Sequence, residues 1–260
     1  MTALDPRTAA DALLDARRTR TPIAPFTDAA PALTAADGYA IQSAVVERLL
    51  AGGDRVVGYK LGLTSAPMQE MMGVDTPDYG PVLASFVHHD GAAVALDAFI
   101  APRIEAEIVL VLRSPLRGPG VTPRDVLAAT AGASAALEII DSRIADWRIK
   151  LPDTIADLAS CGAVAVAGRV VPLDGFDLRL VGMVLTRNGL LVDTGAGAAA
   201  LGDPAAAVAW LANTLAPAGV TLEAGHFVMT GALHRAVPLE RGDVFRAEFD
   251  RLGPLTLRVA

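Results

Sequence analysis

The chain has 260 residues, of which 52% are hydrophobic and 20% charged, so it holds enough apolar material for a core and is not disordered as a whole. With 22 Lys and Arg against 29 Asp and Glu, its net charge is −7 at pH 7. No basic stretch offsets this negative charge, so neither nucleic acid nor an anionic membrane is expected as a partner. The single cysteine, Cys161, excludes a disulfide within the chain and favours a reducing cytoplasm.

The N-terminal part of the chain is predicted to be helical. Asp5 followed by Pro6 is an N-cap pattern, and apolar residues then recur at helical spacing. A second helix begins after Thr34, where Asp37 is placed for a capping box, and stops at a Gly-Gly pair. We assign residues 1–54 to a helical cap segment, which is also a candidate oligomer contact.

Strand patterns dominate the rest of the chain, residues 55–260, which we expect to be the catalytic domain within the same structural unit. The clearest is a hairpin whose turn, Asn188-Gly189, is the strongest short hairpin signal. The stretches 76–81 and 150–162 are predicted to be loops. We therefore expect an α+β fold with a curled, mostly antiparallel β-roll. Strands are predicted over 56–63, 99–112, 134–140, 178–194 (the hairpin), 221–229, 243–249 and 255–259, and helices over 65–72, 122–132 and 203–215.

Three glutamates on predicted strands are candidate metal ligands. Residues two apart share one face of a strand, so Glu105 and Glu107 point the same way, while the residues between them face a core. Glu138 lies within an apolar strand, where a buried carboxylate needs a partner. Oxygen-only ligation suits Mg²⁺ or Mn²⁺ rather than zinc. The alternatives are a solvent-exposed strand edge, and a structural salt bridge from Glu138 to Arg143 or Arg103.

Lys60 and Asp78 are candidate acid–base groups. Lys60 is one of only two lysines among 22 basic residues, and an ammonium, unlike a guanidinium, has a pKa that its surroundings can tune. Gly58 and Gly62 share its strand face and clear space for a ligand. Asp78 lies in a turn-forming stretch. A snorkelling surface lysine and a plain turn aspartate are the alternatives.

A set of short motifs covers nearly the whole chain. They are GYKLGLTS from Gly58, MMGV from Met71, PDYG from Pro77, RIEAE from Arg103, LEIIDSR from Leu137, DWRIK from Asp146, DTIAD from Asp153, TGAL from Thr230 and PLERGD from Pro238. Together they resemble the 2-keto-4-pentenoate hydratase family of the fumarylacetoacetate hydrolase superfamily. That family also includes 2-oxohept-3-ene-1,7-dioate hydratase and 4-oxalocrotonate decarboxylase.

The resemblance implies a mixed β-roll fold in a homo-oligomer and a bound Mg²⁺ or Mn²⁺. The metal would be held by Glu105, Glu107 and Glu138. The same resemblance implies acid–base roles for Lys60 and Asp78.

The resemblance also implies a substrate contact at Ser160, and we take Thr64 and Lys150 as further candidate substrate contacts. One position departs from the family pattern: Leu158 stands where the family often has Asn. If that Asn orders the loop or touches substrate, affinity or substrate choice differs in this chain.

The predicted activity is hydration of 2-hydroxypenta-2,4-dienoate to 4-hydroxy-2-oxopentanoate, in the meta-cleavage catabolism of aromatic compounds. The metal would favour the 2-keto tautomer. Lys60 and Asp78 are the candidate proton carriers, and a metal-lined pocket would shift the pKa of either one towards neutrality. Which of the two serves which proton transfer is open at this point.

Three alternatives remain at this stage. Two belong to the same family: a decarboxylase acting on 2-oxo-3-hexenedioate, and a dicarboxylate hydratase. A dicarboxylate substrate needs a second basic group, which Arg143, Arg148 or Lys150 could supply. The third alternative, a non-catalytic partner subunit, belongs to a different class, and the intact set of candidate site residues argues against it.

Overall fold

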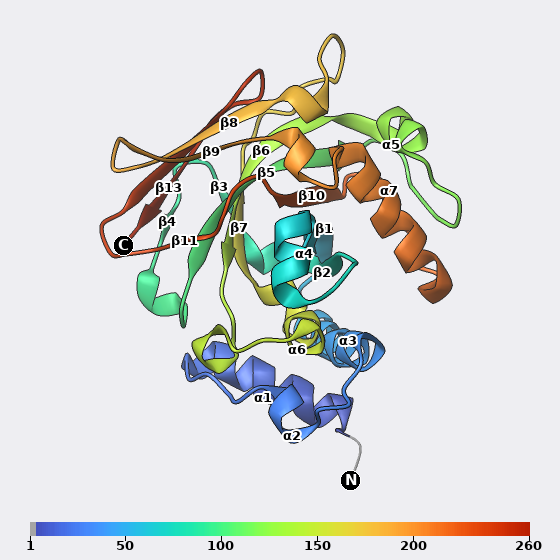
Figure 1. The fold of residues 1–260 in the computed structure, drawn as a ribbon, viewed down its shortest axis with the longest axis vertical. Coiled ribbons are helices and arrows are strands. Elements are labelled where there is room, and N and C mark those ends of the chain that lie inside the picture. The colour runs from blue at the N-terminus through green and yellow to red at the C-terminus, as the bar shows by residue number, and fades with distance from the viewer. Residues whose placement is uncertain (1–3) are drawn as a thin grey trace.

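The computed structural model describes residues 4–260 and arranges them as two curled β-sheets with helices packed around them (Figure 1). The helices are α1 (Pro6–Thr19), α2 (Phe26–Ala29), α3 (Ala35–Ala51), α4 (Ala66–Met72), α5 (Pro123–Ala129), α6 (Leu151–Ala156) and α7 (Pro204–Leu215). The strands are β1 (Val56–Gly62), β2 (Asp78–Leu83), β3 (Val87–His89), β4 (Ala93–Val94), β5 (Arg103–Leu112), β6 (Thr130–Ile140), β7 (Cys161–Val166), β8 (Gly182–Arg187), β9 (Leu190–Ala196), β10 (Phe227–Ala232), β11 (Val237–Pro238), β12 (Val244–Phe249) and β13 (Gly253–Val259).

The two sheets have a mixed topology. The larger has eight strands in the order β2-β1-β10-β5-β6-β7-β3, with β11 paired to β5, and the smaller has five in the order β4-β13-β12-β8-β9. The pairs β1–β10, β3–β7 and β4–β13 are parallel, and the remaining strand pairs of both sheets are antiparallel. This confirms the predicted α+β fold with a mostly antiparallel β-roll.

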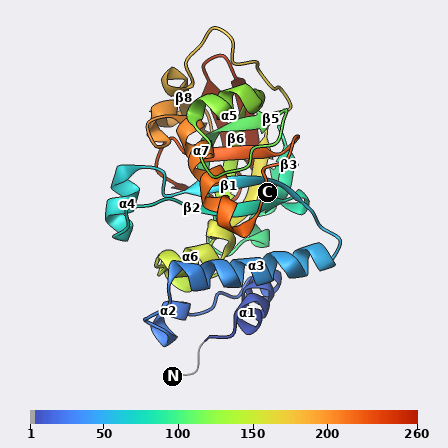
Figure 2. The same cartoon turned by 90° about the vertical axis from the view of Figure 1, so that its right-hand side faces the viewer.

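The larger sheet has an apolar core on each face. One face packs against the smaller sheet and α7, where Ile108 and Phe245 are fully buried. The opposite face packs against α1 and α3 through residues such as Leu13 and Val109. Figure 2 shows α1 and α3 as a helical layer on one side of the sheets. Because side chains alternate along a strand, each central strand contributes residues to both cores.

Local signals in the sequence place several elements correctly. Asp5 caps α1 by accepting a hydrogen bond from the Thr8 backbone N–H at 3.0 Å. Thr34 and Asp37 form the predicted capping box at the start of α3. The Asn188-Gly189 turn joins β8 to β9, as its hairpin pattern predicts. None of the helices within residues 4–260 combines the length and apolarity that crossing a membrane needs.

Two stretches predicted to be loops are instead ordered elements. The stretch 76–81 contains the start of β2, and 150–162 contains α6, the 3₁₀ turn η4 (Leu158–Ser160) and the start of β7. Gly80 is needed because a Cβ there would lie 2.5 Å from the Leu158 carbonyl oxygen. Pro81 is tolerated because β2 is at the edge of its sheet. Turn-forming residues therefore serve close packing rather than a turn.

Strand boundaries differ from the prediction where glycine or a bend hides the pattern. β6 begins at Thr130 instead of Ser134, and Gly132, expected as a helix stop, lies within it. A Cβ at Gly132 would lie 2.4 Å from the Val171 carbonyl oxygen, so this glycine admits a neighbouring chain segment. β5 begins at Arg103 and β10 at Phe227, later than predicted.

Candidate active site

Three glutamates meet on the helix-facing side of the larger sheet. Glu105 and Glu107 on β5 share a face, and Glu138 on β6 is the direct register partner of Glu105. One carboxylate oxygen from each lies within 4.8 Å of the other two. Glu107 accepts a hydrogen bond from the Gly231 N–H at 2.8 Å. Both oxygens of the fully buried Glu138 lack a hydrogen-bond partner among residues 4–260.

This carboxylate cluster is electrostatically suited to a cation. Burial, reinforced by the charge of Glu138, raises the pKa of Glu105 to about 7. The same two causes raise the pKa of Glu107 well above its ordinary value. A divalent cation would relieve this repulsion and give the unpartnered Glu138 oxygens a ligand role. The donor set, all carboxylate oxygens, fits Mg²⁺, Mn²⁺ or Ca²⁺.

Lys60 lies beside the glutamates and is itself buried. Its Nζ is 3.4 Å from Glu138 Oε2 and donates a hydrogen bond to the Ala159 carbonyl oxygen at 2.9 Å. Burial alone would lower the pKa of Lys60, but the negative charges of Glu138 and Asp78 outweigh burial and raise it. Without a cation between the carboxylates, the cluster therefore favours the charged ammonium.

Asp78 is the first residue of β2 and is also buried. Burial raises its pKa, even though the nearby Lys60 charge lowers it, so its shift towards neutrality is as expected. Its Oδ1 has no hydrogen-bond partner among the described residues. A Cβ on Gly62 would lie 2.2 Å from Asp78 Oδ1 and 3.4 Å from Lys60 Nζ, so this glycine makes room for the Asp78 side chain beside Lys60. Gly58 instead admits the Phe227 carbonyl oxygen of β10.

A cavity of about 180 Å³, here called the active-site cavity, joins these groups. Of the three glutamates only Glu105 lines it, with Glu107 and Glu138 clustered beside Glu105. Trp147 forms part of its wall under the guanidinium of Arg103, which is 4.5 Å from the ring centre. Its polar lining residues are Lys60, Asp78, Arg103, Glu105, Thr154 and Ser160. Its apolar lining includes Leu63, Met68, Met72, Ile140, Trp147 and Ile149.

The three predicted substrate contacts occupy different places. Ser160 lines the active-site cavity, and its hydroxyl oxygen is 3.2 Å from Thr154 Oγ1. Thr64 lines a neighbouring cavity of about 430 Å³ that shares Glu105 with the first. Lys150 is exposed at the start of α6, outside the residues that line either cavity.

The turn that carries Ser160 has an unusual backbone. Leu158, Ala159 and Ser160 have φ angles of 56°, 50° and 57°, in the left-handed region. Such a conformation costs a residue with a side chain about 1–2 kcal/mol. The Leu158 side chain is buried in the core beside α1 and α3, and it does not line the active-site cavity. This position therefore anchors the turn rather than touching the cavity.

Several cavity groups were not identified by sequence reasoning. Thr154 lies in the stretch taken as a loop, and the Ala159 carbonyl carries no side-chain signal at all. The sequence suggests Arg103 only as a salt-bridge partner of Glu138, whereas in the structure it stacks on Trp147 at the cavity wall. The DWRIK motif, which contains Trp147, was the available signal for this wall.

A β-roll that gathers three carboxylates, a buried lysine and an aspartate at one cavity defines an enzyme with a divalent-metal site. Residues 61–260 match the family described as fumarylacetoacetate (FAA) hydrolase C-terminal, and the chain belongs to this family.

Two relatives of established name are hydratases. The chain is 42% identical over 248 residues to 2-hydroxyhexa-2,4-dienoate hydratase of Comamonas testosteroni, covering 95% of this chain and 94% of the relative. It is 43% identical over 253 residues to 2-keto-4-pentenoate hydratase of Paraburkholderia xenovorans strain LB400, covering 97% and 94%. The predicted family and the predicted hydro-lyase class are confirmed.

A solved structure matches over the whole chain. It is 4-oxalocrotonate decarboxylase from Pseudomonas putida G7, complexed with magnesium and adipate. The TM-score is 0.96 at 38% identity, and the match covers 100% of this chain and 99% of the other. The magnesium in that relative supports dependence on a divalent metal, in agreement with the carboxylate cluster.

Proposed function

We propose that this enzyme adds water to 2-hydroxypenta-2,4-dienoate and forms 4-hydroxy-2-oxopentanoate. The observation that carries the proposal is a small cavity lined by Lys60, Asp78 and Glu105, where Glu105 belongs to the cluster of three glutamates. Hydratases acting on substrates of this kind are among the relatives at 42–43% identity. The largely apolar lining of a cavity of about 180 Å³ suits a short, largely apolar acid.

Glu105, Glu107 and Glu138 would hold the metal, which we propose to be Mg²⁺ or Mn²⁺. When bound, the metal supplies Lewis-acid polarisation of the oxygens of a 2-oxo acid and stabilises enolate charge. Glu105 also lines the cavity, so the substrate would approach the carboxylate cluster from the side of Glu105.

The protein's own groups divide the proton transfers. Asp78, whose pKa burial raises, is the group suited to give a proton to C5 of the dienol and to recover one from the water that adds at C4. Lys60 stays charged among the carboxylates and would orient the substrate oxygens and supply the C3 proton. Taken together, one water is consumed and its hydroxyl ends at C4. The hydrogens gained at C3 and C5 are balanced by one proton from that water, which returns to Asp78, and by the 2-hydroxyl proton of the dienol, which returns to Lys60 as the 2-oxo group forms.

The positions of the basic residues favour a monocarboxylate. Arg143 is buried and paired with Asp157, and Arg148 is exposed and paired with Asp28. Lys150 lies outside the cavity. None of the three is placed to bind a distal carboxylate there.

Decarboxylation of 2-oxo-3-hexenedioate is the second candidate. Two observations favour it: the near-complete structural match to the decarboxylase, and Arg103 on the cavity wall, where it could meet a second carboxylate. The same Arg103 would serve a dicarboxylate hydratase.

An ultraviolet assay with product identification separates these activities. Purified enzyme with Mg²⁺ or Mn²⁺ is given 2-hydroxypenta-2,4-dienoate and, separately, 2-oxo-3-hexenedioate. We expect metal-dependent loss of the dienoate and formation of 4-hydroxy-2-oxopentanoate. Carbon dioxide released from the diacid, with the dienoate untouched, would establish the decarboxylase. No turnover and no bound metal would favour a non-catalytic partner subunit.

The proposal includes a homo-oligomeric enzyme working in the cytoplasm. The family resemblance supports the oligomer, and the single buried cysteine is compatible with a reducing compartment. Light scattering on the purified protein measures the subunit number directly.

A further inference from the structure

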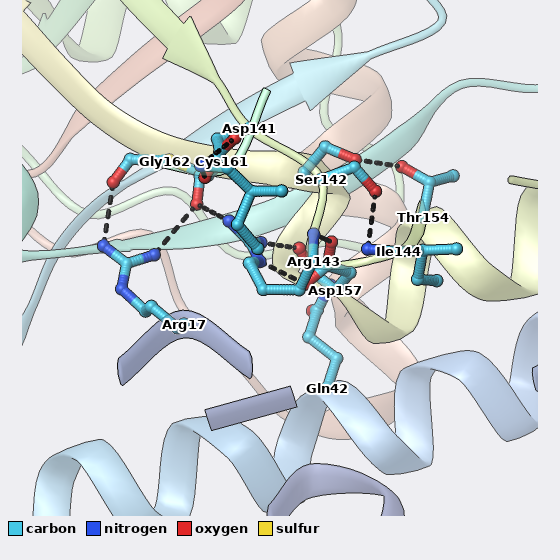
Figure 3. Close-up of polar contacts among 12 residues, drawn as sticks. Arg17, Gln42, Asp141, Ser142, Arg143, Ile144, Thr154, Asp157, Cys161 and Gly162 are labelled. Carbon is cyan, nitrogen blue, oxygen red and sulfur yellow. Dashed lines mark hydrogen bonds and ion pairs between the residues drawn. The ribbon is translucent and has the colours of Figure 1, made fainter. Parts of the chain in front are cut away.

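Arg143 is a buried charged residue to which the proposed reaction gives no part. Its backbone N–H donates to Asp157 Oδ2 at 2.8 Å, and its Nε donates to Asp157 Oδ1 (Figure 3). Its Nη2 donates to the Asp157 carbonyl oxygen, and its Nη1 to the Cys161 carbonyl oxygen at 3.0 Å. One guanidinium therefore binds the main chain at two points, four residues apart.

Those two points are the ends of the strained turn Leu158–Ser160. Three consecutive left-handed residues persist only where their surroundings over-determine them. Arg143 fixes the carbonyls on both sides of the turn, and the Ser160 carbonyl accepts a further hydrogen bond from the Asp141 N–H at 2.8 Å.

A second arginine, from α1, reaches the far end of the same turn. Arg17 Nη2 donates to the Gly162 carbonyl oxygen at 2.8 Å, and Arg17 Nη1 donates to the Cys161 carbonyl oxygen at 3.3 Å. Figure 3 shows Arg17 and Arg143 approaching the Cys161 segment from different sides. Arg17 also packs its guanidinium over the Phe86 ring, 3.9 Å from the ring centre.

The turn presents two groups to the active-site cavity. The Ala159 carbonyl oxygen accepts from Lys60 Nζ at 2.9 Å, and the Ser160 hydroxyl lines the cavity. The carboxylates near Lys60 come from β2, β5 and β6, which attract the ammonium in their own directions. The Ala159 carbonyl is therefore the contact that places Lys60 Nζ relative to the turn.

We propose that Arg143 is a positioning residue for catalysis: by holding both ends of the Leu158–Ser160 turn, it aims the Ala159 carbonyl at Lys60 and so fixes the ammonium. The planar guanidinium is suited to this because its donors reach two carbonyls and a carboxylate at once, which an ammonium cannot do. The inference rests on the proposed role of Lys60.

Arg143→Lys tests the inference because it keeps the positive charge beside Asp157 but loses the fork of donors. We expect kcat to fall by about 10- to 100-fold, since small misplacements of a reacting group cost this much. The KM should stay within about twofold, because binding contacts common to ground and transition states are kept. Metal affinity, measured by calorimetry without substrate, should be unchanged, since Arg143 makes no contact with the three glutamates.

The lysine composition provides a readout that needs no turnover. With only Lys60 and Lys150 in the chain, lysine-selective ¹³C,¹⁵N labelling gives two side-chain signals. Lys60→Met assigns them by removing one. In Arg143→Lys the Lys60 signal should move while the exposed Lys150 signal stays in place. Arg148→Met is the matched control: this arginine lies in the same segment, is exposed and pairs with Asp28, and its loss should change neither signal nor kcat.

Arg17→Met tests the same inference at the far end of the turn, and it replaces the first variant if Arg143→Lys does not fold. It should move the Lys60 signal and lower kcat, with metal affinity kept. An unmoved Lys60 signal with kcat near wild type would overturn the inference. So would a joint fall of kcat, metal affinity and melting temperature, because that pattern indicates general structural support. If the wild type turns over no dienoate, the proposed function fails, while the Lys60 signal still reports on the turn.

Discussion

Two buried groups of charges lie close together on the helix-facing side of the larger sheet, and they are built differently. In the Arg143–Asp157 pair, both oxygens of the carboxylate and three guanidinium nitrogens have hydrogen-bond partners. In the group around Lys60, Glu138 Oε1 and Oε2 and Asp78 Oδ1 have none among the residues that the structure describes.

This difference in hydrogen bonding distinguishes a pair with a structural role from a group with a catalytic role. Burying a charge costs several kcal/mol unless hydrogen bonds and an opposite charge compensate, roughly as they do at Arg143. Buried polar atoms that have no hydrogen-bond partner in a well-packed interior indicate a ligand site or a catalytic role. The satisfied pair holds the backbone, and the unsatisfied group is where metal and substrate would bind.

The largest effect on activity should come from removing the ammonium of Lys60 from the group that lacks hydrogen-bond partners. Lys60→Met should lower kcat by about 10²- to 10⁴-fold, the range for loss of a positioned proton-transfer group. Lys150→Met is the matched control, since it removes the other lysine from an exposed site. Steady-state assays at saturating metal measure both. Turnover near wild type in Lys60→Met, or in Asp78→Asn, would remove that residue from the mechanism.

The next effect should come from the unpartnered carboxylate. Glu138→Gln should weaken divalent-metal binding by at least about 100-fold, because it removes a charged ligand. The metal-free variant should be no less stable than the metal-free wild type, since removing a carboxylate that has no hydrogen bonds and repels Glu105 and Glu107 offsets the loss of its ion pair with Lys60. Calorimetry and thermal melts check the two halves. Glu248→Gln, at an exposed glutamate, is the control, and a large loss of stability in Glu138→Gln would contradict the comparison.

The two groups also differ in how far the sequence predicts them. Strand alternation predicts that Glu105 and Glu107 share a face, and an isolated acid in an apolar strand marks Glu138. The capping boxes and the Asn188-Gly189 turn are likewise local signals. The Lys60–Ala159 contact joins positions 99 residues apart through a main-chain carbonyl, and no side-chain pattern encodes it. Glycines such as Gly80 make a strand look like a turn in the sequence. Their role, which is to leave room for another chain segment, is visible only in the folded structure.

A smaller effect concerns pH. The pKa of Glu105 is raised from 4.5 to about 7 in the fold, so the metal-free folded protein binds protons that the unfolded chain releases. The stability contributed by this protonation is present below about pH 4.5 and is lost as pH rises through 7. Metal binding should reverse the trend and release protons.

Melting temperatures at pH 5.5 and 8, with a chelator or with excess Mg²⁺, measure this dependence. Glu105→Gln isolates it from the other acidic groups: the metal-free variant should lose less stability between the two pH values than the metal-free wild type. Equal pH slopes in both proteins would show that Glu105 titrates normally.

The smallest effect should come from an ion pair that is neither buried nor unsatisfied. Arg148 and Asp28 are about half exposed, with side-chain exposures of 56% and 48%, and they link the segment before α6 to α2. Water solvates both charges when the pair is broken, so Arg148→Met should change the free energy of unfolding by no more than about 1 kcal/mol. Denaturant titration measures this. Asp157→Asn, at the buried pair, should by contrast cost about 3–5 kcal/mol, since it leaves Arg143 charged in an apolar surrounding. Similar losses in the two variants would mean that burial does not set the strength of these contacts, and the distinction between the two charged groups would lose its physical basis.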